Sequence, residues 1–291
     1  MNASTTSDAK GARSTGSGRS AESPSSVVPE TEHRPAPGWT PSQFKPNDYA
    51  SMHALRNEVS HTSASATNKA RDIREYTLGE EIANSVTHGL GALLAIAAIP
   101  ILVVRALDDG GGIYLFAALV YTLTMLLEYT MSTLYHAIAV DRAKRVFKVL
   151  DHSCIYLFIA GSYTPFCLIS LADSGGVWLC AFVWLVALAG VACEAFWVFR
   201  PRWVSAVLYL LMGWCVIWFL PALIEAIPGP GLWLLVGGGI CYSIGCIFYV
   251  LKKVPYMHSL FHLWVLAGSV LQFLAIFLYV MYAVACISAR A

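Results

Sequence analysis

The chain has few charged residues. Asp, Glu, Lys and Arg make up 13% of its 291 residues, whereas a soluble globular domain carries roughly 25%. So little charge does not suit a protein that faces water on all sides. The net charge of +1 comes without a basic face, so we expect no nucleic-acid partner.

Paired cysteines are also missing. The motif Cys-x-x-Cys does not occur, which leaves a thiolate metal site without support. All eight cysteines fall inside apolar segments rather than in loops, so we predict no disulfide framework and interpret them as small packing residues. They are Cys154, Cys167, Cys180, Cys193, Cys215, Cys241, Cys246 and Cys286.

Residues 1–70 lack any apolar run. They are rich in Ser, Thr, Ala, Pro and Gly and hold seven of the nineteen Lys and Arg residues. Such a segment cannot bury enough apolar surface to fold, so we predict a disordered tail. No apolar stretch of signal-peptide length follows its first basic residues, which disfavours a cleavable signal peptide. A transit peptide stays open, because the first 28 residues are rich in Ser.

What the chain does have is long apolar runs, which begin after residue 75. A membrane-spanning helix needs about 20 such residues, and the ~10-residue alternation of a transmembrane barrel is not found. We therefore predict an all-α transmembrane bundle of seven helices over residues 75–288. Pro165 is expected to bend the third and shortest segment. The segments are Ile82–Ala106, Ile113–Ala139, Cys154–Ala172, Val177–Phe199, Trp203–Ala226, Leu232–Leu251 and Met257–Ile287.

The connections between these segments differ sharply in charge. Those at residues 108–112, 173–176 and 228–231 contain no Lys or Arg. The others hold eight, and cytoplasmic loops are the ones enriched in Lys and Arg. We therefore expect a cytoplasmic N-terminus, a C-terminus outside and a location in the plasma (inner) membrane. The eight residues are Arg142, Lys144, Arg145, Lys148, Arg200, Arg202, Lys252 and Lys253.

Ionisable side chains inside membrane helices are costly, and each one suggests a functional site. Here most of them lie near the ends predicted to be cytoplasmic, whereas chance would scatter them over both faces. Asn84 adds a polar amide to the same part of the first helix. The set comprises Glu80, Glu81, His88, Glu128, His136, Asp151, His152, Glu194, Glu225, His258 and His262.

Spacing brings some of these residues onto common helix faces. His258 and His262 are four apart, as are Ser132 and His136, and Glu128 extends the second stripe by one turn. Three neutral imidazoles with a fourth position left to water are typical of a catalytic zinc site. Such a pair is also common without a metal, and a histidine at a helix end is often a solvated or capping residue.

Asp151 is the carboxylate that we expect beside this site. It could accept a hydrogen bond from a metal-bound water, or from the second ring nitrogen of a ligand. His152 lies roughly 100° further round the same helix, so we interpret it as a packing or loop-bonding residue. Glu194 and Glu225 are interpreted as structural or as facing the interior.

Four motifs resemble those of the haemolysin III family, in the family's order and over about residues 75–287. They are residues 80–89 (EEIANSVTHG), 132–136 (STLYH), 151–156 (DHSCIY) followed by 160–165 (AGSYTP), and 258–262 (HSLFH). Each motif alone is weak, but together they are highly specific.

The family is grouped with the progestin and adipoQ receptors and, more distantly, with the alkaline ceramidases. The resemblance implies a seven-helix bundle with zinc near the cytoplasmic side. It implies that His136, His258 and His262 bind the zinc, with Asp151 near its water and Ser132 as the motif serine.

Three functions remain open at this point, because fold kinship does not settle function. The first is a zinc hydrolase of lipid amides, with Asp151 as base, Ser132 orienting water or the oxyanion, and a membrane lipid as substrate. The second is a non-catalytic receptor or homeostasis protein in which zinc staples helices together. The third, a pore-forming cytolysin, has least support, because the outer turns are short and the outer halves of the helices have few polar residues.

Overall fold

The structure is a computed structural model of the chain. It describes residues 53, 56–60, 76–109, 111–197, 201–251 and 253–281. Most of the predicted tail, and Cys286, therefore lie outside the described residues. Residues 61–291 group into one compact unit and residues 1–60 into another.

Seven helices in the second unit are long and apolar enough to cross a membrane. The part of the chain that the structure describes contains no strand. The predicted all-α bundle of seven membrane helices is thus confirmed, and the side of the membrane that each end faces stays a prediction. The helices are Leu78–Asp108, Gly111–Ala137, Asp141–Ser170, Gly176–Trp197, Arg202–Ala226, Gly229–Val250 and Met257–Val280.

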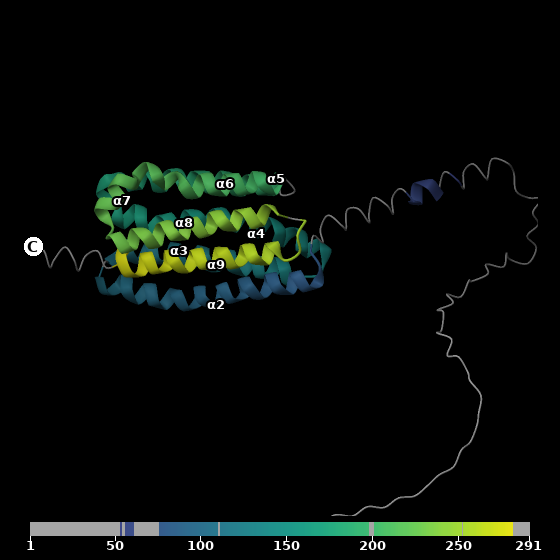
Figure 1. Ribbon diagram of the computed structural model, residues 1–291, viewed down its shortest axis with the longest axis horizontal. Helices are drawn as coiled ribbons and strands as arrows, with labels where there is room; N and C mark the ends of the chain where they lie inside the picture. Colours follow the sequence, from purple (N-terminus) through teal and green to yellow (C-terminus); the bar gives the residue numbers. More distant parts are fainter. Residues whose placement is uncertain are drawn as a thin grey trace, which may run out of the picture. The chain divides into compact units, whose positions relative to one another are not determined.

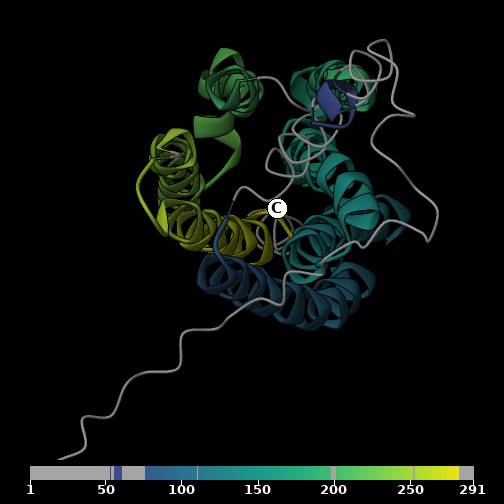
Figure 2. The same ribbon diagram turned by 90° about the vertical axis from the view of Figure 1, so that its right-hand side faces the viewer.

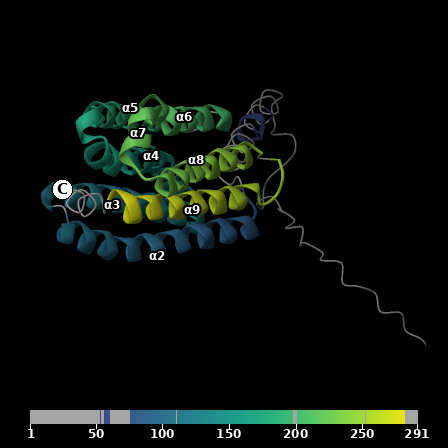
Figure 3. The ribbon, with the colours of Figure 1, turned by 60° about the vertical axis from the view of Figure 1, so that its left-hand side comes forward.

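The helices lie alongside one another, and seen from one end they surround an interior (Figures 1 and 2). α9 packs between α2 and α8, and α3 packs between α2 and α4 (Figure 3). The elements are α2 (Leu78–Asp109), α3 (Gly111–Ala137), α4 (Asp141–Pro165), η2 (Phe166–Ser170), η3 (Ala172–Ser174), α5 (Gly176–Trp197), α6 (Arg202–Trp214), η4 (Cys215–Phe219), α7 (Leu220–Ala226), α8 (Gly229–Val250), α9 (Met257–Ala275) and η5 (Ile276–Val280).

Large apolar side chains cover the outside of the bundle. Trp178, Phe196 and Trp218 are 77%, 91% and 83% exposed, which would be a large apolar surface in water but suits a helix that faces lipid. Polar groups lie inside instead: Asn84 and Glu194 are completely buried. The pattern is that of a bundle whose solvent is the bilayer and whose interior carries the chemistry.

The third membrane helix begins earlier than the sequence predicts. Residues 141–148 form the first two turns of α4 rather than a loop, and this span is 30 residues long rather than the shortest. Lys144 and Lys148 are buried there. By hydropathy alone, these two lysines mark the end of the apolar segment. Hydropathy contains no information about partners that a buried lysine contacts on other helices. Lys144, for example, donates to the Tyr135 carbonyl oxygen at 2.8 Å.

Two of the membrane helices contain irregular turns. α4 is followed directly after Pro165 by the π-helical turn η2, at the point where the sequence predicts a bend. The fifth predicted segment, Trp203–Ala226, is divided into α6, the 3-10 turn η4 and α7. Such turns are frequent next to functional cavities, and η4 and α7 line the apolar cavity described below.

Candidate metal centre

Three histidines meet inside one end of the bundle. α3 supplies His136, and successive turns of α9 supply His258 and His262. One ligand atom from each lies within 4.8 Å of the others, and the two Nε2 atoms of His258 and His262 are 3.1 Å apart. His136 and His262 are 3% and 1% exposed. The structure therefore brings together the three histidines that the sequence singles out.

The partners of two imidazoles decide which ring nitrogen can bind a metal. His136 Nδ1 lies 2.7 Å from the Glu81 carboxylate, and His262 Nδ1 lies 3.2 Å from the main-chain oxygen of Asn84. Because both partners accept hydrogen bonds, each Nδ1 carries the proton and donates it. Each Nε2 is then left with a lone pair, as in histidines that bind metals.

The spacing of the ring nitrogens also fits a metal ion. Zinc–nitrogen bonds of about 2.0–2.1 Å in a tetrahedral site place neighbouring nitrogens roughly 3.3 Å apart, close to the 3.1 Å between the two Nε2 atoms of α9. The same distance suits a hydrogen bond between the two rings when no metal is bound, with one Nε2 as the donor. The donor set is thus suited to a divalent metal that prefers nitrogen.

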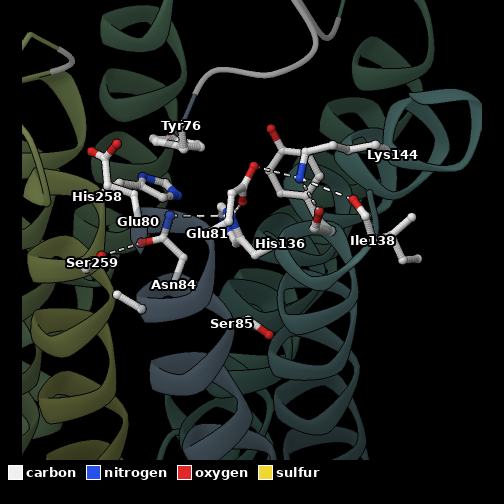
Figure 4. Close-up of polar contacts among 12 residues, drawn as sticks. Tyr76, Glu80, Glu81, Asn84, Ser85, His136, Ile138, Lys144, His258 and Ser259 are labelled. Atoms are coloured by element: carbon white, nitrogen blue, oxygen red, sulfur yellow. Dashed lines mark hydrogen bonds and ion pairs between the residues drawn. The ribbon is translucent and has the colours of Figure 1, made fainter. Parts of the chain in front are cut away.

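Glu81 is the residue that links this site to α4. One carboxylate oxygen accepts from His136, and the other lies 2.7 Å from Lys144 Nζ (Figure 4). Lys144 also lies over the ring of Tyr135, 4.8 Å from its centroid. The partly buried carboxylate is therefore paired with the lysine that the sequence places in a loop. A carboxylate–histidine contact of this kind orients a ligand and raises its basicity.

Asn84 ties α2 to both ligand helices. Its Nδ2 lies 3.4 Å from His136 Nδ1, and its Oδ1 accepts from the Ser259 hydroxyl at 2.5 Å (Figure 4). Thr87, three residues further along α2, lies 3.2 Å from His262 Nδ1 through its hydroxyl. A single face of α2 thus holds the partners of ligands on α3 and α9.

His88 lies beneath the three histidines and is not a member of the metal group. Its ring stacks on His262 with centroids 3.5 Å apart and meets the Tyr129 ring edge-on at 5.0 Å. Neither ring nitrogen has a hydrogen-bond partner among the described residues. Its observed role is to pack against a ligand ring.

Asp151 and Ser132 form a second polar group next to the metal group. The Ser132 hydroxyl hydrogen-bonds the Asp151 carboxylate, which also interacts electrostatically with Lys148. Ser132 is one turn from His136 on α3, about 6 Å along the helix axis. Asp151 is not in the set of side chains that could hold the metal. The contact to the second ring nitrogen, one of two roles expected for Asp151, is made for His136 by Glu81.

Buried acidic groups continue away from this pair. Glu128, one turn below Ser132, is 3% exposed and interacts electrostatically with Asp151. On the other side, His152 lies between Asp151 at 4.0 Å and Glu194 at 3.7 Å. His152 and Glu194 therefore belong to one polar network, and the roles expected for them stay predictions.

An apolar cavity of about 310 Å³ lies among α4, α6, α8 and α9. Glu128 provides a carboxylate at its wall, and Phe261 provides an aromatic ring. The Phe261 ring also contacts His258 and His262, with centroid distances of 5.4 and 5.6 Å. The Phe261 ring therefore lies against both the apolar cavity and two histidines of the metal group.

The sequence identifies only part of the site. Glu81 and Asn84 are candidates there without an assigned role, although their spacing with His88 places all three near one face of a helix. Lys144 falls in a predicted loop, and Tyr76, which stacks on His258 at 4.9 Å and 21°, lies before the first apolar run. Only the position of Tyr76 in the fold identifies it as part of the site.

A family model and several known proteins match this chain. The family model described as haemolysin-III related matches residues 76–273. Hemolysin-3 of Bacillus cereus is 43% identical over 202 residues, which is 69% of this chain and 92% of that protein. The hemolysin-3 homolog of Bacillus subtilis is 41% identical over 204 residues, or 70% of this chain and 96% of that protein.

A human protein is a more distant relative. The monocyte to macrophage differentiation factor of Homo sapiens is 28% identical over 216 residues, which is 70% of this chain and 85% of that protein. The region matched by the family model contains the first six membrane helices, most of the seventh, and the three histidines. On these grounds the chain is a multi-pass membrane protein that belongs to the haemolysin III family.

Proposed function

We propose that this protein is a zinc-dependent hydrolase of lipid amides in the plasma (inner) membrane, with its metal site near the cytoplasmic face. The observation that carries the proposal is the group of three histidines on α3 and α9. Among the described residues it has no carboxylate or thiolate as a fourth member. A structural zinc site is normally closed by a fourth protein ligand, so an open position supports a catalytic role.

Zinc is the metal that this donor set suits best. Imidazole nitrogen is a common zinc ligand, and three protein ligands with one open position are the usual catalytic arrangement. The Glu81 carboxylate and the Asn84 carbonyl supply the outer contacts that such ligands receive in zinc proteins. When bound, zinc supplies Lewis acidity that polarises a carbonyl group and increases the acidity of water.

Other residues of the chain have separate roles in the proposed reaction. Asp151 takes the proton of the attacking water, and Ser132 holds that carboxylate through its hydrogen bond. Glu81 and Asn84 keep His136 and His262 in the tautomers that leave Nε2 available. The apolar cavity beside Phe261 accepts the acyl chain from the bilayer.

A receptor or homeostasis protein with a structural zinc is the alternative. It is favoured by the way in which the site joins helices: ligands come from α3 and α9, and their partners come from α2 and α4. A bound metal would then stabilise the bundle by linking segments far apart in the sequence.

Hydrolysis can be measured directly. Purified protein in detergent is expected to release fatty acid from at least one member of a panel of ceramides and N-acyl lipids, because zinc and Asp151 together activate water. Chelation should abolish this release, and added zinc should restore it. Turnover that continues after complete removal of the metal would refute the mechanism.

The orientation of the bundle is tested by labelling. In a variant whose eight native cysteines are replaced, a cysteine at Gly112 should react with an impermeant thiol reagent added to whole cells. A cysteine at Val140, which is 66% exposed between α3 and α4, should react only after the membrane is opened. The reverse pattern would place the metal group on the outer side.

A further inference from the structure

The apolar cavity among α4, α6, α8 and α9 has a carboxylate in its wall. Aliphatic and aromatic side chains make up most of the lining, and Leu210, Leu232, Leu235 and Val236 are among them. The volume of about 310 Å³ corresponds to roughly ten heavy atoms, at about 30 Å³ for each water-sized group. A cavity of this size and lining suits a hydrocarbon chain, and a plain hydrocarbon chain makes no use of a carboxylate.

Tyrosine hydroxyl groups in the cavity wall have partners within the protein. Tyr163 and Tyr209 donate to main-chain carbonyl oxygens at 2.6 and 3.3 Å. The hydroxyl of Tyr242 lies 3.1 Å from the hydroxyl of Ser269. These groups therefore hold helices together and need no ligand to complete their hydrogen bonding.

Glu128 differs from these tyrosines. It lines the cavity and is 3% exposed, and its Oε2 atom has no hydrogen-bond partner among the described residues. It interacts electrostatically with Asp151, which is another acidic group. A carboxyl oxygen that is shielded from water and lacks a partner is costly inside a membrane bundle. Such a group in a native protein calls for an explanation, and a polar group of a ligand supplies one.

The position of Glu128 on α3 indicates which part of a ligand it meets. Glu128, Ser132 and His136 follow one another at four-residue spacing on this helix. The Cα atoms of Glu128 and His136 are therefore about 12 Å apart along the helix axis. When the carbonyl group of an amide lies at the histidines, Glu128 meets the far part of the acyl chain rather than the amide nitrogen.

We propose that Glu128 binds a hydroxyl group carried on the acyl chain in the apolar cavity, far from the carbonyl group. The inference rests on the proposed function for the position of that carbonyl group, and it narrows the substrate class to amides of chain-hydroxylated fatty acids. A hydroxyl group donates to a carboxylate and accepts from a carboxylic acid, so it is a partner for Glu128 in either state. An ammonium group is a poorer partner, because its transfer from water into an apolar cavity costs far more.

The reaction of such a substrate is balanced without a further reagent. Water adds to the acyl carbon, the bond between that carbon and the amide nitrogen breaks, and the nitrogen leaves with a proton. The products are a hydroxy fatty acid and an amine, and the chain hydroxyl is unchanged.

The binding test uses ketones, because a ketone has a carbonyl group but no bond that can be hydrolysed. The long pair is tridecan-4-one and 13-hydroxytridecan-4-one. The short pair is nonan-4-one and 9-hydroxynonan-4-one, whose hydroxyl group does not reach Glu128 from a carbonyl group at the histidines. Affinities are measured by calorimetry on the full chain in detergent. The ratio of affinities within each pair is compared between proteins, so that partition into detergent cancels.

The hydroxyl group should favour binding only in the long pair. In the unaltered protein, the affinity ratio of hydroxy ketone to parent should be about 10-fold higher for the long pair than for the short pair, since hydrogen bonds to charged groups contribute at this level. Equal ratios for the two pairs would overturn the inference without the need for any variant.

Variants test whether Glu128 is the partner. Glu128→Leu, which suits an apolar wall, should lower the ratio of the long pair about 10-fold and leave that of the short pair unchanged. Glu128→Gln should retain part of the effect, because its amide still donates and accepts. Glu225→Leu is the matched control: Glu225 is an exposed carboxylate of α7 that does not line the cavity, and its loss should leave both ratios unchanged.

The two proposals fail in different ways. The corresponding amides, N-ethyldecanamide and N-ethyl-10-hydroxydecanamide, are assayed for release of their fatty acids. A long-pair ratio that survives in both Glu128→Leu and Glu128→Gln would overturn the role of Glu128 even if both amides are hydrolysed. A ratio that depends on Glu128, without release of acid from either amide, would support the hydroxyl site and contradict the hydrolase.

Discussion

Purified protein is expected to contain about one zinc ion per chain, as a single site with three imidazoles implies. His136→Ala, His258→Ala or His262→Ala should each remove most of this metal, because two remaining imidazoles bind weakly. The double variant with both α9 histidines replaced should remove nearly all of it. Metal content measured by mass spectrometry after gel filtration would show the loss.

Two further variants test whether the residues around the three histidines affect zinc affinity. Glu81→Gln keeps the three ligands but weakens the partner of His136, so zinc affinity should fall by roughly 10- to 100-fold. His152→Ala is the matched control, because this histidine contacts Asp151 and Glu194 and lies outside the metal group. Full zinc occupancy after loss of both α9 histidines would disprove the metal site.

Asp151→Asn is expected to retain zinc and to lose turnover of a lipid amide. The amide of Asn keeps the shape and part of the hydrogen bonding with Ser132, but it cannot take a proton from water. A general base typically contributes about 10²–10⁴-fold to the rate, so the loss would be visible above the background of the assay. Zinc content is measured on the same preparation, because the conclusion requires an occupied site.

The alternative function predicts a different result for the same variant. If zinc only links helices, Asp151→Asn should lower the melting temperature, and no amide should be hydrolysed by the unaltered protein. Asp173→Asn provides the control, since Asp173 is an exposed carboxylate in η3, and it should change neither quantity. A fully active Asp151→Asn variant would remove Asp151 from the mechanism.

The sequence by itself determined the properties that depend on neighbours along the chain. Seven apolar runs define seven membrane helices, because each helix satisfies its own backbone hydrogen bonds and needs only length and apolarity. The four-residue spacing of His258 and His262 places both on one face of α9 for the same local reason. His136 joins them as a candidate through its depth in the bundle and the family resemblance, so all three histidines of the metal group can be named from the sequence.

Only the tertiary structure decided which residues meet across helices. Glu81 and His136 are 55 residues apart, and Tyr76 and Arg202 are 126 residues apart, so no local period relates them. The start of α4 at Asp141 depends on such contacts too. Lys144 can be buried because it forms an ion pair with Glu81 and donates a hydrogen bond to the Tyr135 carbonyl oxygen. A charged side chain in a sequence looks the same whether it faces water or a buried partner, and the packing of helices alone makes the difference.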